Sequence, residues 1–363
     1  MSGSPTVPIW PEGSPLAGPH HHNGAMRRGL VVLSASLAAG AAVLVVPPIA
    51  ARPAEPVATT TKAGGVHTIG GCEIFPADNP WNTRIDGLPV ASNSDAIIDR
   101  QAAGSDIHLD LGTTESFYGM PVTVVDQAQP LVRLRFGVEG ENYADESDKG
   151  PVPIPRKAHI EGWRKSRPNP PGGDRHVVVV RRGTCDLTEL YKAKRMKNKA
   201  GDFTGWRASS AARWDLSSNA LRPKYWTSAD AAGLPILPGL LDYDEAATGT
   251  ITHALRFTLP VARNAFTAPA RHCGNTSGKN LPSFGMRFRL KAGFDDSVYN
   301  GAAKAVVVAM KQYGLMFADQ GSAMYVTGMT DPRWSGVLDQ FRAHPIDGSR
   351  FEVVDPGPIT VCR

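Results

Sequence analysis

The sequence predicts a mainly β fold, a β-sandwich or jelly roll with a few helices. Segments with strand character clearly outnumber segments with helical periodicity. The helical segments do not alternate with the strands, as they would in a doubly wound parallel sheet. Several strands alternate apolar and polar residues, which is typical of a sheet with one face on a core. Together these observations favour an antiparallel sandwich.

The chain contains 363 residues, 42% of them hydrophobic and 20% charged, and this composition supplies ample apolar side chains for a core. We expect an N-terminal extension with a signal segment over 1–54 and a polar linker over 55–71. Residues 72–363 then form a single β-rich globular domain, which we expect to be a monomer.

The N-terminal signal segment is predicted from three features in sequence. Met26-Arg27-Arg28 precedes an apolar run over 30–46, and small residues follow Pro47-Pro48. A basic start, an apolar stretch and small residues at the end are typical of a cleaved secretory signal. We therefore expect a secreted, extracellular protein, exported by the Sec route or, given the two arginines, by the twin-arginine route. An uncleaved signal segment is the alternative and would be the only membrane contact.

The elements of the domain follow in chain order. A helix is expected over 95–103 after a capping Ser94, and the segment 137–173 is expected to be a long loop. The clearest helix spans 301–313, where apolar residues recur at helical spacing before Gly314. A second helix is expected over 333–343. The expected strands lie at 121–126, 131–136, 176–182, 185–191, 250–259, 285–291, 315–319, 323–327 and 351–354, and a basic hairpin turn is expected over 192–199.

Four cysteines follow the signal segment: Cys72, Cys185, Cys273 and Cys362. An even number in an exported protein predicts two disulfides, for which three pairings exist. We favour Cys72–Cys362 with Cys185–Cys273, because the first bond would join the two ends of the domain. A metal site of cysteines is disfavoured, because no two of them have the spacing of a CxxC motif.

Three strands carry arginine on the face opposite their apolar residues. The cations are Arg133, Arg135, Arg256, Arg287, Arg289 and Lys291. If the strands share a sheet, these side chains form a basic groove that could bind a carboxylate- or phosphate-bearing polysaccharide. The alternative is a solvated face paired with acidic neighbours. Nucleic acid is disfavoured as a partner, because the protein is exported and the net charge falls from +5 to +3 without residues 1–54.

The stretch 228–259 combines acidic and basic residues with a histidine, and it supplies the catalytic candidates Asp244, Glu245 and His253. Two carboxylates across a cleft could hydrolyse a glycosidic bond. Alternatively, His253 could act as a base in β-elimination while an arginine neutralises a uronate. The non-catalytic alternatives are that the acidic run is simply solvated and that His253 is a core residue whose hydrogen bonds are made within the protein. Strand alternation places His253 and Arg256 on opposite faces, so only a bulge near Ala254 would unite them.

A metal-dependent enzyme is a further alternative, with His253, His176, His272 and Glu245 around zinc or iron. These four residues show no HxH or HExxH spacing that would support such a site. We therefore assign no metal ligand and predict no cofactor. The acidic run 145–148 could hold a structural cation, although it lacks the spacing of a regular calcium loop.

Five phrases carry a resemblance to a known group of proteins: FPADNPWN (75–82), YADESDKGPVPIP (143–155), TSADAAGLPILPGLLDYDE (227–245), ITHALRF (251–257) and MRFRLKAGFD (286–295). In these phrases the chain resembles an uncharacterised family of exported bacterial proteins. The resemblance implies one domain over roughly 72–355 and no particular activity. The short phrase LKAGFD is also similar to the KAG phrase of jelly-roll alginate lyases, whose other motifs this sequence lacks.

These features together predict a secreted carbohydrate-active protein, a glycoside hydrolase or polysaccharide lyase acting on an extracellular, anionic polysaccharide. The main alternative is a secreted protein that binds glycan or cell wall without catalysis. The chain has no GxSxG, P-loop or GxGxxG motif that would indicate another enzyme class.

Overall fold

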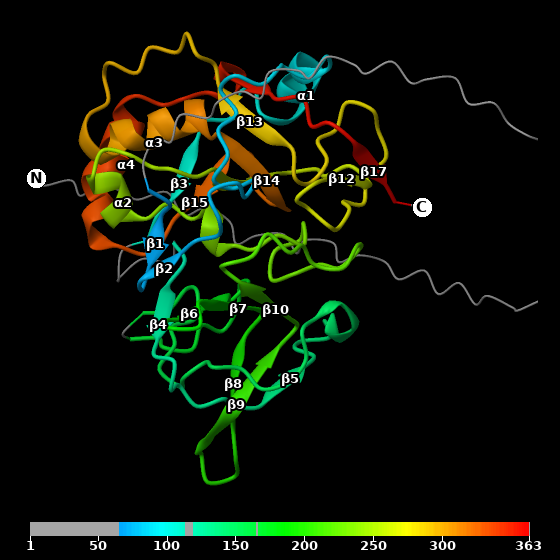
Figure 1. Ribbon diagram of the computed structural model, residues 1–363, viewed down its shortest axis with the longest axis vertical. Helices are drawn as coiled ribbons and strands as arrows, with labels where there is room; N and C mark the ends of the chain where they lie inside the picture. The colour runs from blue at the N-terminus through cyan, green and yellow to red at the C-terminus, as the bar shows by residue number, and fades with distance from the viewer. Residues whose placement is uncertain (1–64, 113–118, 165, 363) are drawn as a thin grey trace, which may run out of the picture. The chain divides into compact units, whose positions relative to one another are not determined.

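The structure, a computed structural model, describes residues 65–112, 119–164 and 166–362 (Figure 1). The predicted extension and signal segment over 1–54 lie outside the described residues. The chain divides into Met1–Thr61 and Lys62–Arg363, and every described helix and strand belongs to the second unit. Part of the expected linker is therefore folded, because β1 (Thr68–Ile69) pairs with β2 (Cys72–Glu73).

Strands outnumber helices in the part of the chain that the structure describes, and the predicted mainly β fold with few helices is confirmed. The four α-helices there are α1 (Ser94–Gln101), α2 (Tyr243–Ala247), α3 (Gly301–Gln312) and α4 (Ser335–Ala343). Short 3₁₀ helices span Ala144–Glu146, Leu237–Gly239, Pro332–Trp334 and Gly348–Arg350.

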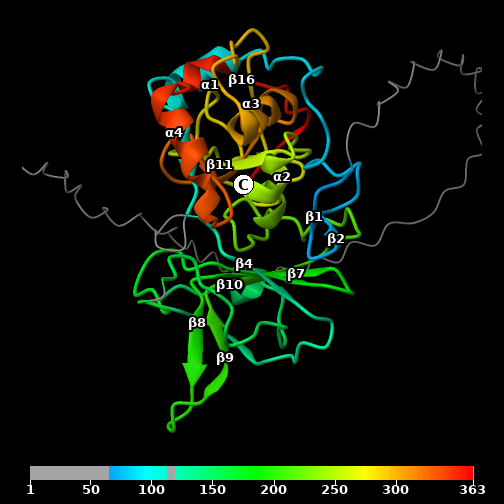
Figure 2. The same ribbon diagram turned by 90° about the vertical axis from the view of Figure 1, so that its left-hand side faces the viewer.

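The largest sheet has six strands in the order β16-β13-β14-β11-β15-β3. They are β3 (His108–Asp110), β11 (Leu255–Leu259), β13 (Arg287–Leu290), β14 (Leu315–Gln320), β15 (Tyr325–Thr327) and β16 (Phe351–Val353). Helix α3 packs on β13, and α2 and α4 pack against α3 (Figure 2). The main core lies here, around the fully buried rings of Phe257, Phe288 and Phe317.

A four-stranded sheet, in the order β10-β7-β6-β4, lies between two hydrophobic cores. Its strands are β4 (Val122–Val125), β6 (Val177–Arg181), β7 (Asp186–Tyr191) and β10 (Ser210–Asp215). Alternate valines of β6 face opposite ways: Val178 and Val180 join the main core, whereas Val177 and Val179 join a second core around Trp206. This arrangement explains why β6 is a continuous apolar run.

The second core is closed by a three-stranded sheet, β5-β9-β8, which gives this part of the chain a sandwich arrangement. Its strands are β5 (Leu134–Phe136), β8 (Lys194–Lys197) and β9 (Phe203–Ala208). The segment 192–199, expected to be a turn, therefore contains a strand. The antiparallel arrangement that we expected holds only in part, because β4·β6, β5·β9, β11·β14 and β15·β3 are parallel pairs.

Two disulfides are present, as predicted, but the favoured pairing is wrong. The bonds join Cys72 to Cys185 and Cys273 to Cys362, with Cα atoms 5.4 and 6.4 Å apart. The first ties β2 to the start of β7, and the second lies beside β12 (Ala265–Thr267) and β17 (Ile359–Val361), which pair with each other. Disulfides are compatible with an extracellular protein. Within the described ranges, no helix has both the length and the hydropathy to cross a membrane.

Candidate functional site

A buried ion pair lies within a group of interacting ionisable side chains. Arg256, only 5% exposed on β11, donates from Nε and Nη2 to the two carboxylate oxygens of Asp230, at 3.0 Å each. Its Nη1 donates to Thr327 Oγ1 at 2.6 Å. The predicted role of Arg256 in a solvent-facing basic groove is thus not what the structure shows, because its guanidinium is committed to an internal carboxylate.

Two further carboxyl groups lie beside this ion pair and have raised pKa values. Burial raises the pKa of Asp110, at the end of β3, to about 6, and the charge of Glu161 adds to this effect. Burial and the neighbouring charge of Asp230 likewise raise the pKa of Asp319, on β14, well above its usual range. Asp319 lies 3.9 Å from Arg256 and keeps 27% of its side chain exposed. Both acids are therefore biased toward the neutral form, in which a carboxyl can donate a proton.

Glu161 has the opposite bias. Burial opposes its ionisation, but the charge and hydrogen bond of His176 outweigh burial and lower its pKa. His176 Nδ1 lies 2.6 Å from Glu161 Oε2, and its Nε2 faces the carbonyl of Ala229 at 3.0 Å. Both ring nitrogens therefore face acceptors, and the carboxylate raises the pKa of His176 to about 9 against the effect of burial. Asp110 and Glu161 are thus electrostatically interacting carboxyl groups whose pKa values are shifted in opposite directions.

His253 and Glu245, both catalytic candidates from the sequence, are brought together. His253 Nε2 lies 3.0 Å from Glu245 Oε2, and their side chains are 2% and 10% exposed. Burial opposes both charges, but the pair raises the pKa of His253 and lowers that of Glu245 to about 2. His67 stacks on His253 with ring centroids 5.1 Å apart, and its Nε2 lies 3.0 Å from Asp242 Oδ2. We call this second group the His67 cluster: His67, Asp242, Glu245 and His253.

The expected relation between His253 and Arg256 changes because β11 begins only at Leu255. His253 precedes the strand, so the alternation that assigned it a face does not apply. Arg256 pairs with Asp230, whereas His253 pairs with Glu245, so the ion-pair group around Arg256 and the His67 cluster are two different sites.

Asp244, the third catalytic candidate, joins neither group. It is exposed at 77% of its side chain and pairs with Arg333 at 2.7 Å. His176 and His272 also lie away from His253: His176 pairs with Glu161, and His272 lies 3.9 Å from Glu146. The expected metal set of these three histidines with Glu245 is therefore not formed.

The acidic run 145–148 has protein partners rather than the arrangement of a cation loop. Asp148 Oδ2 accepts from Arg222 Nη1 at 2.5 Å, and Glu146 Oε2 accepts from the amide of Thr227 at 2.9 Å. These contacts fasten the long loop to the segment before Asp230.

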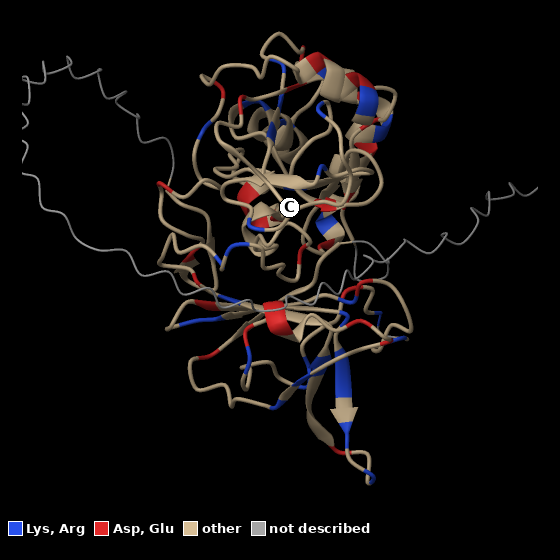
Figure 3. Ribbon diagram, turned by 90° about the vertical axis from the view of Figure 1, so that its right-hand side faces the viewer, with Lys and Arg blue, Asp and Glu red and all other residues tan. Residues whose placement is uncertain are grey.

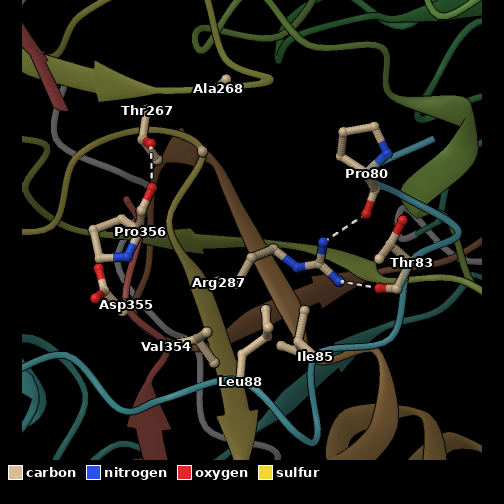
Figure 4. Close-up of a pocket in the computed structure, with 11 residues that line it drawn as sticks. Pro80, Thr83, Ile85, Leu88, Thr267, Ala268, Arg287, Val354, Asp355 and Pro356 are labelled. Carbon is tan, nitrogen blue, oxygen red and sulfur yellow. Dashed lines mark hydrogen bonds between the residues drawn. The ribbon is translucent and has the colours of Figure 1, made fainter. Parts of the chain in front are cut away.

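Arg287 and Arg289, expected to bind substrate, hold the segment 80–88 against β13. Arg289 pairs with Glu352 at 2.6 Å and donates to the carbonyls of Ile85 and Leu88 at 2.5 and 2.8 Å. Arg287 lines a cavity of about 240 Å³ (Figure 4), where it donates to the carbonyls of Pro80, at 2.6 Å, and Tyr313. Burial lowers the pKa of Arg287 to about 9. These bonds to main-chain carbonyls give both arginines a structural role.

Arg135 lies on β5 and Arg133 directly precedes it, whereas Arg256, Arg287 and Arg289 belong to the six-stranded sheet, so the six do not form one groove. Both Arg133 and Arg135 are exposed. Strand register places Arg135 beside Arg207, and Arg207 beside Lys194. These last three residues form a cationic row across β5, β9 and β8, and Figure 3 shows the basic residues of β8.

Sequence reasoning missed Asp110, Asp319, Asp230 and His67. Asp110 and Asp319 do have a recognisable position, because each stands at or near the end of an apolar strand. Glu161 lies in the long loop that the sequence singled out. His67 offers no such signal, because it falls in a stretch with the composition of a linker.

Comparison with protein-family models, with curated proteins and with solved structures found no match to this chain. Any functional assignment therefore rests on the geometry and charge of the site itself.

Proposed function

We propose that the protein is a secreted carbohydrate-active enzyme that hydrolyses an extracellular polysaccharide by acid–base catalysis. The observation that carries the proposal is the pair Asp110 and Glu161, partly exposed carboxyl groups with pKa values shifted in opposite directions. Glycoside hydrolysis needs one carboxylic acid to protonate the leaving oxygen and one carboxylate to assist attack. Asp110 takes the first role and Glu161 the second, and His176 keeps Glu161 ionised.

Hydrolysis is favoured over β-elimination because of the state of Arg256. In the β-elimination considered above, an arginine would neutralise the uronate carboxyl group, whereas Arg256 is bound to Asp230 through both oxygens. Asp319, 3.9 Å from Arg256, is a second carboxyl group with a raised pKa.

The test is incubation of the purified protein with a panel of neutral and uronic polysaccharides, following new reducing ends and the ultraviolet absorbance of unsaturated uronates. Reducing ends without that absorbance support hydrolysis, and rising absorbance would instead indicate a lyase. We expect Asp110→Asn and Glu161→Gln each to lower kcat at least about 100-fold. Asp339→Asn is the matched control, because its carboxylate is 72% exposed and pairs with Arg342, which is equally exposed. Full activity in both site variants would refute the assignment.

Non-catalytic binding of an anionic wall glycan is the second candidate, supported by the cationic row Arg135, Arg207 and Lys194. Such binding should weaken with salt, because exposed charges are screened. The double variant Arg135→Ala/Lys194→Ala should then lose retention on an anionic polysaccharide, whereas Lys279→Ala, an exposed cation elsewhere, should not. Equal retention of both variants would exclude the row as the binding surface.

A further inference from the structure

The side chains of the His67 cluster point three electron-pair donors at one another. The donor atoms are His67 Nδ1, Glu245 Oε2 and His253 Nε2, all within 4.8 Å of one another. Glu245 Oε2 lies 3.0 Å from His253 Nε2 and 3.8 Å from His67 Nδ1. Zinc bound tetrahedrally, with bonds of about 2.1 Å, requires ligand atoms about 3.4 Å apart. These two separations lie on either side of that value, and the separation between the two imidazole nitrogens is at most 4.8 Å, so side-chain rotations can bring the three atoms to tetrahedral positions.

Neighbouring groups fix the orientation of each of these side chains. His67 Nε2 faces Asp242 Oδ2 at 3.0 Å, and His253 Nδ1 faces the carbonyl of Ala254 at 2.8 Å. A carboxylate and a carbonyl can only accept, so both of these ring nitrogens carry hydrogen. The other oxygen of Glu245 accepts from the amide and hydroxyl of Thr252, at 2.9 and 3.0 Å. Carboxylate or carbonyl partners on the distal nitrogen are the usual support of metal-binding histidines.

This orientation leaves an unsatisfied atom inside the protein. His67 is 7% exposed, and its Nδ1 is buried without a hydrogen-bond partner among the described residues. A proton on His253 Nε2 would satisfy the contact with Glu245 but would leave His67 Nδ1 unpaired, at a cost in stability. A metal ion would accept electron pairs from both nitrogens and from the carboxylate at once.

We propose that His67, Glu245 and His253 bind a divalent transition-metal ion of the zinc class, with Asp242 positioning His67. Two imidazoles and one carboxylate are a ligand set that zinc accepts. The site joins three segments: the approach to β1, helix α2 and the approach to β11. Because the ligands come from these separate segments, the bound ion fastens the β1–β2 hairpin to the six-stranded sheet. The ligand side chains are at most 10% exposed, so the ion is shielded from water. The inference is independent of the proposed hydrolysis at Asp110 and Glu161.

The test uses the full chain with His20, His21 and His22 replaced by alanine, because three consecutive histidines would bind metal themselves. The protein is stripped with a chelator, reloaded with zinc, desalted and analysed by plasma mass spectrometry. We expect about one zinc per chain and a higher Tm than in the stripped protein. Cobalt in place of zinc should give the visible absorption bands of a low-symmetry site with nitrogen and oxygen ligands.

His67→Gln, Glu245→Gln and His253→Gln should each reduce bound zinc to background and abolish the cobalt bands. His344→Gln, an exposed histidine outside the cluster, should retain both. Zinc content, Tm and the cobalt spectrum of the chain that keeps His67, Glu245 and His253 test the metal site even if a variant fails to fold. A folded, stripped chain that takes up no zinc or cobalt would overturn the proposal and leave a protonated His253 paired with Glu245. Metal that survives all three substitutions would overturn it as well.

Discussion

Arg256 and Asp230 form an ion pair with two hydrogen bonds of 3.0 Å, and both side chains are almost fully withdrawn from water. The pair joins β11 to the segment between β10 and the 3₁₀ helix Leu237–Gly239, and Thr327 extends it to β15. A buried guanidinium that loses its carboxylate remains charged, because its pKa is far above any physiological pH. The stability of the surrounding structure therefore depends on both partners.

Asp230→Ala should destabilise the protein by about 3–5 kcal/mol, because the buried charge of Arg256 loses both carboxylate hydrogen bonds and keeps only the more distant Asp319, 3.9 Å away. Urea unfolding followed by tryptophan fluorescence measures this loss. Asp339→Ala breaks an exposed pair and should cost about 0.5 kcal/mol or less. A loss below about 1 kcal/mol in Asp230→Ala would mean that water reaches Arg256.

Asp110→Asn should change how stability depends on pH. The carboxyl of Asp110 has a pKa of about 6 when folded, against an ordinary value of 3.8. The folded chain therefore holds this proton more tightly, so its contribution to stability is complete below the ordinary pKa and disappears as the pH rises through 6. The Asp110→Asn variant has no carboxyl group at this position, so it does not lose this contribution to the free energy of unfolding as the pH rises. Its stability relative to the unsubstituted chain should rise by up to about 3 kcal/mol between pH of about 4 and 7.

Urea unfolding at several pH values tests this difference, with Asp339→Asn expected to run parallel to the unsubstituted chain. A difference between Asp110→Asn and the unsubstituted chain that stays constant with pH would show that Asp110 ionises normally. If the proposed acid role holds, kcat should also fall as the pH rises through about 6.

Glu189 should be sensitive to the loss of its oxygen atoms. It is 0% exposed, and its carboxyl accepts from the amides of Ile236 and Leu237, each at 2.9 Å. Glu189→Ala leaves these amides without partners and creates a cavity, so we expect a loss of about 2–4 kcal/mol in the free energy of unfolding. Glu189→Gln keeps an acceptor oxygen and should lose clearly less. Equal losses in the two variants would show that the amide bonds do not stabilise the fold.

The disulfide between Cys72 and Cys185 closes a loop with a sequence separation of 113. Replacing both residues by serine should destabilise the protein by about 3–5 kcal/mol, because the unfolded chain gains freedom. Denaturant unfolding measures the loss, and reductant should then have little further effect on this loop. Digestion of the unreduced protein should yield linked peptides for Cys72–Cys185 and Cys273–Cys362. Peptides linking Cys72 to Cys362 would contradict the pairing.

Local patterns were sufficient for much of the fold. The continuous apolar run at β6 is typical of a strand buried on both faces, and Val177 to Val180 do contact two cores. Helical spacing between residues 301 and 313 predicted α3 to within one residue. His253 and Glu245 were grouped because both lie in the stretch 228–259, and the short helix α2 and the turn after it bring their side chains together. In each case the determining contacts lie near one another in the chain.

By itself, the sequence determined the mainly β class and the number of disulfides, and it singled out Glu245 and His253 as candidates for chemistry. Only the tertiary structure decided their partners. Arg256 meets Asp230, Cys72 meets Cys185 and His67 meets Glu245 across 26, 113 and 178 positions of sequence, respectively. The alternation of side chains along a strand describes that strand alone. It does not show which side chains from other segments of the chain will pack against it. Burial of an ionisable group depends on those approaching segments, so the charge state of the site is a property of the packed chain.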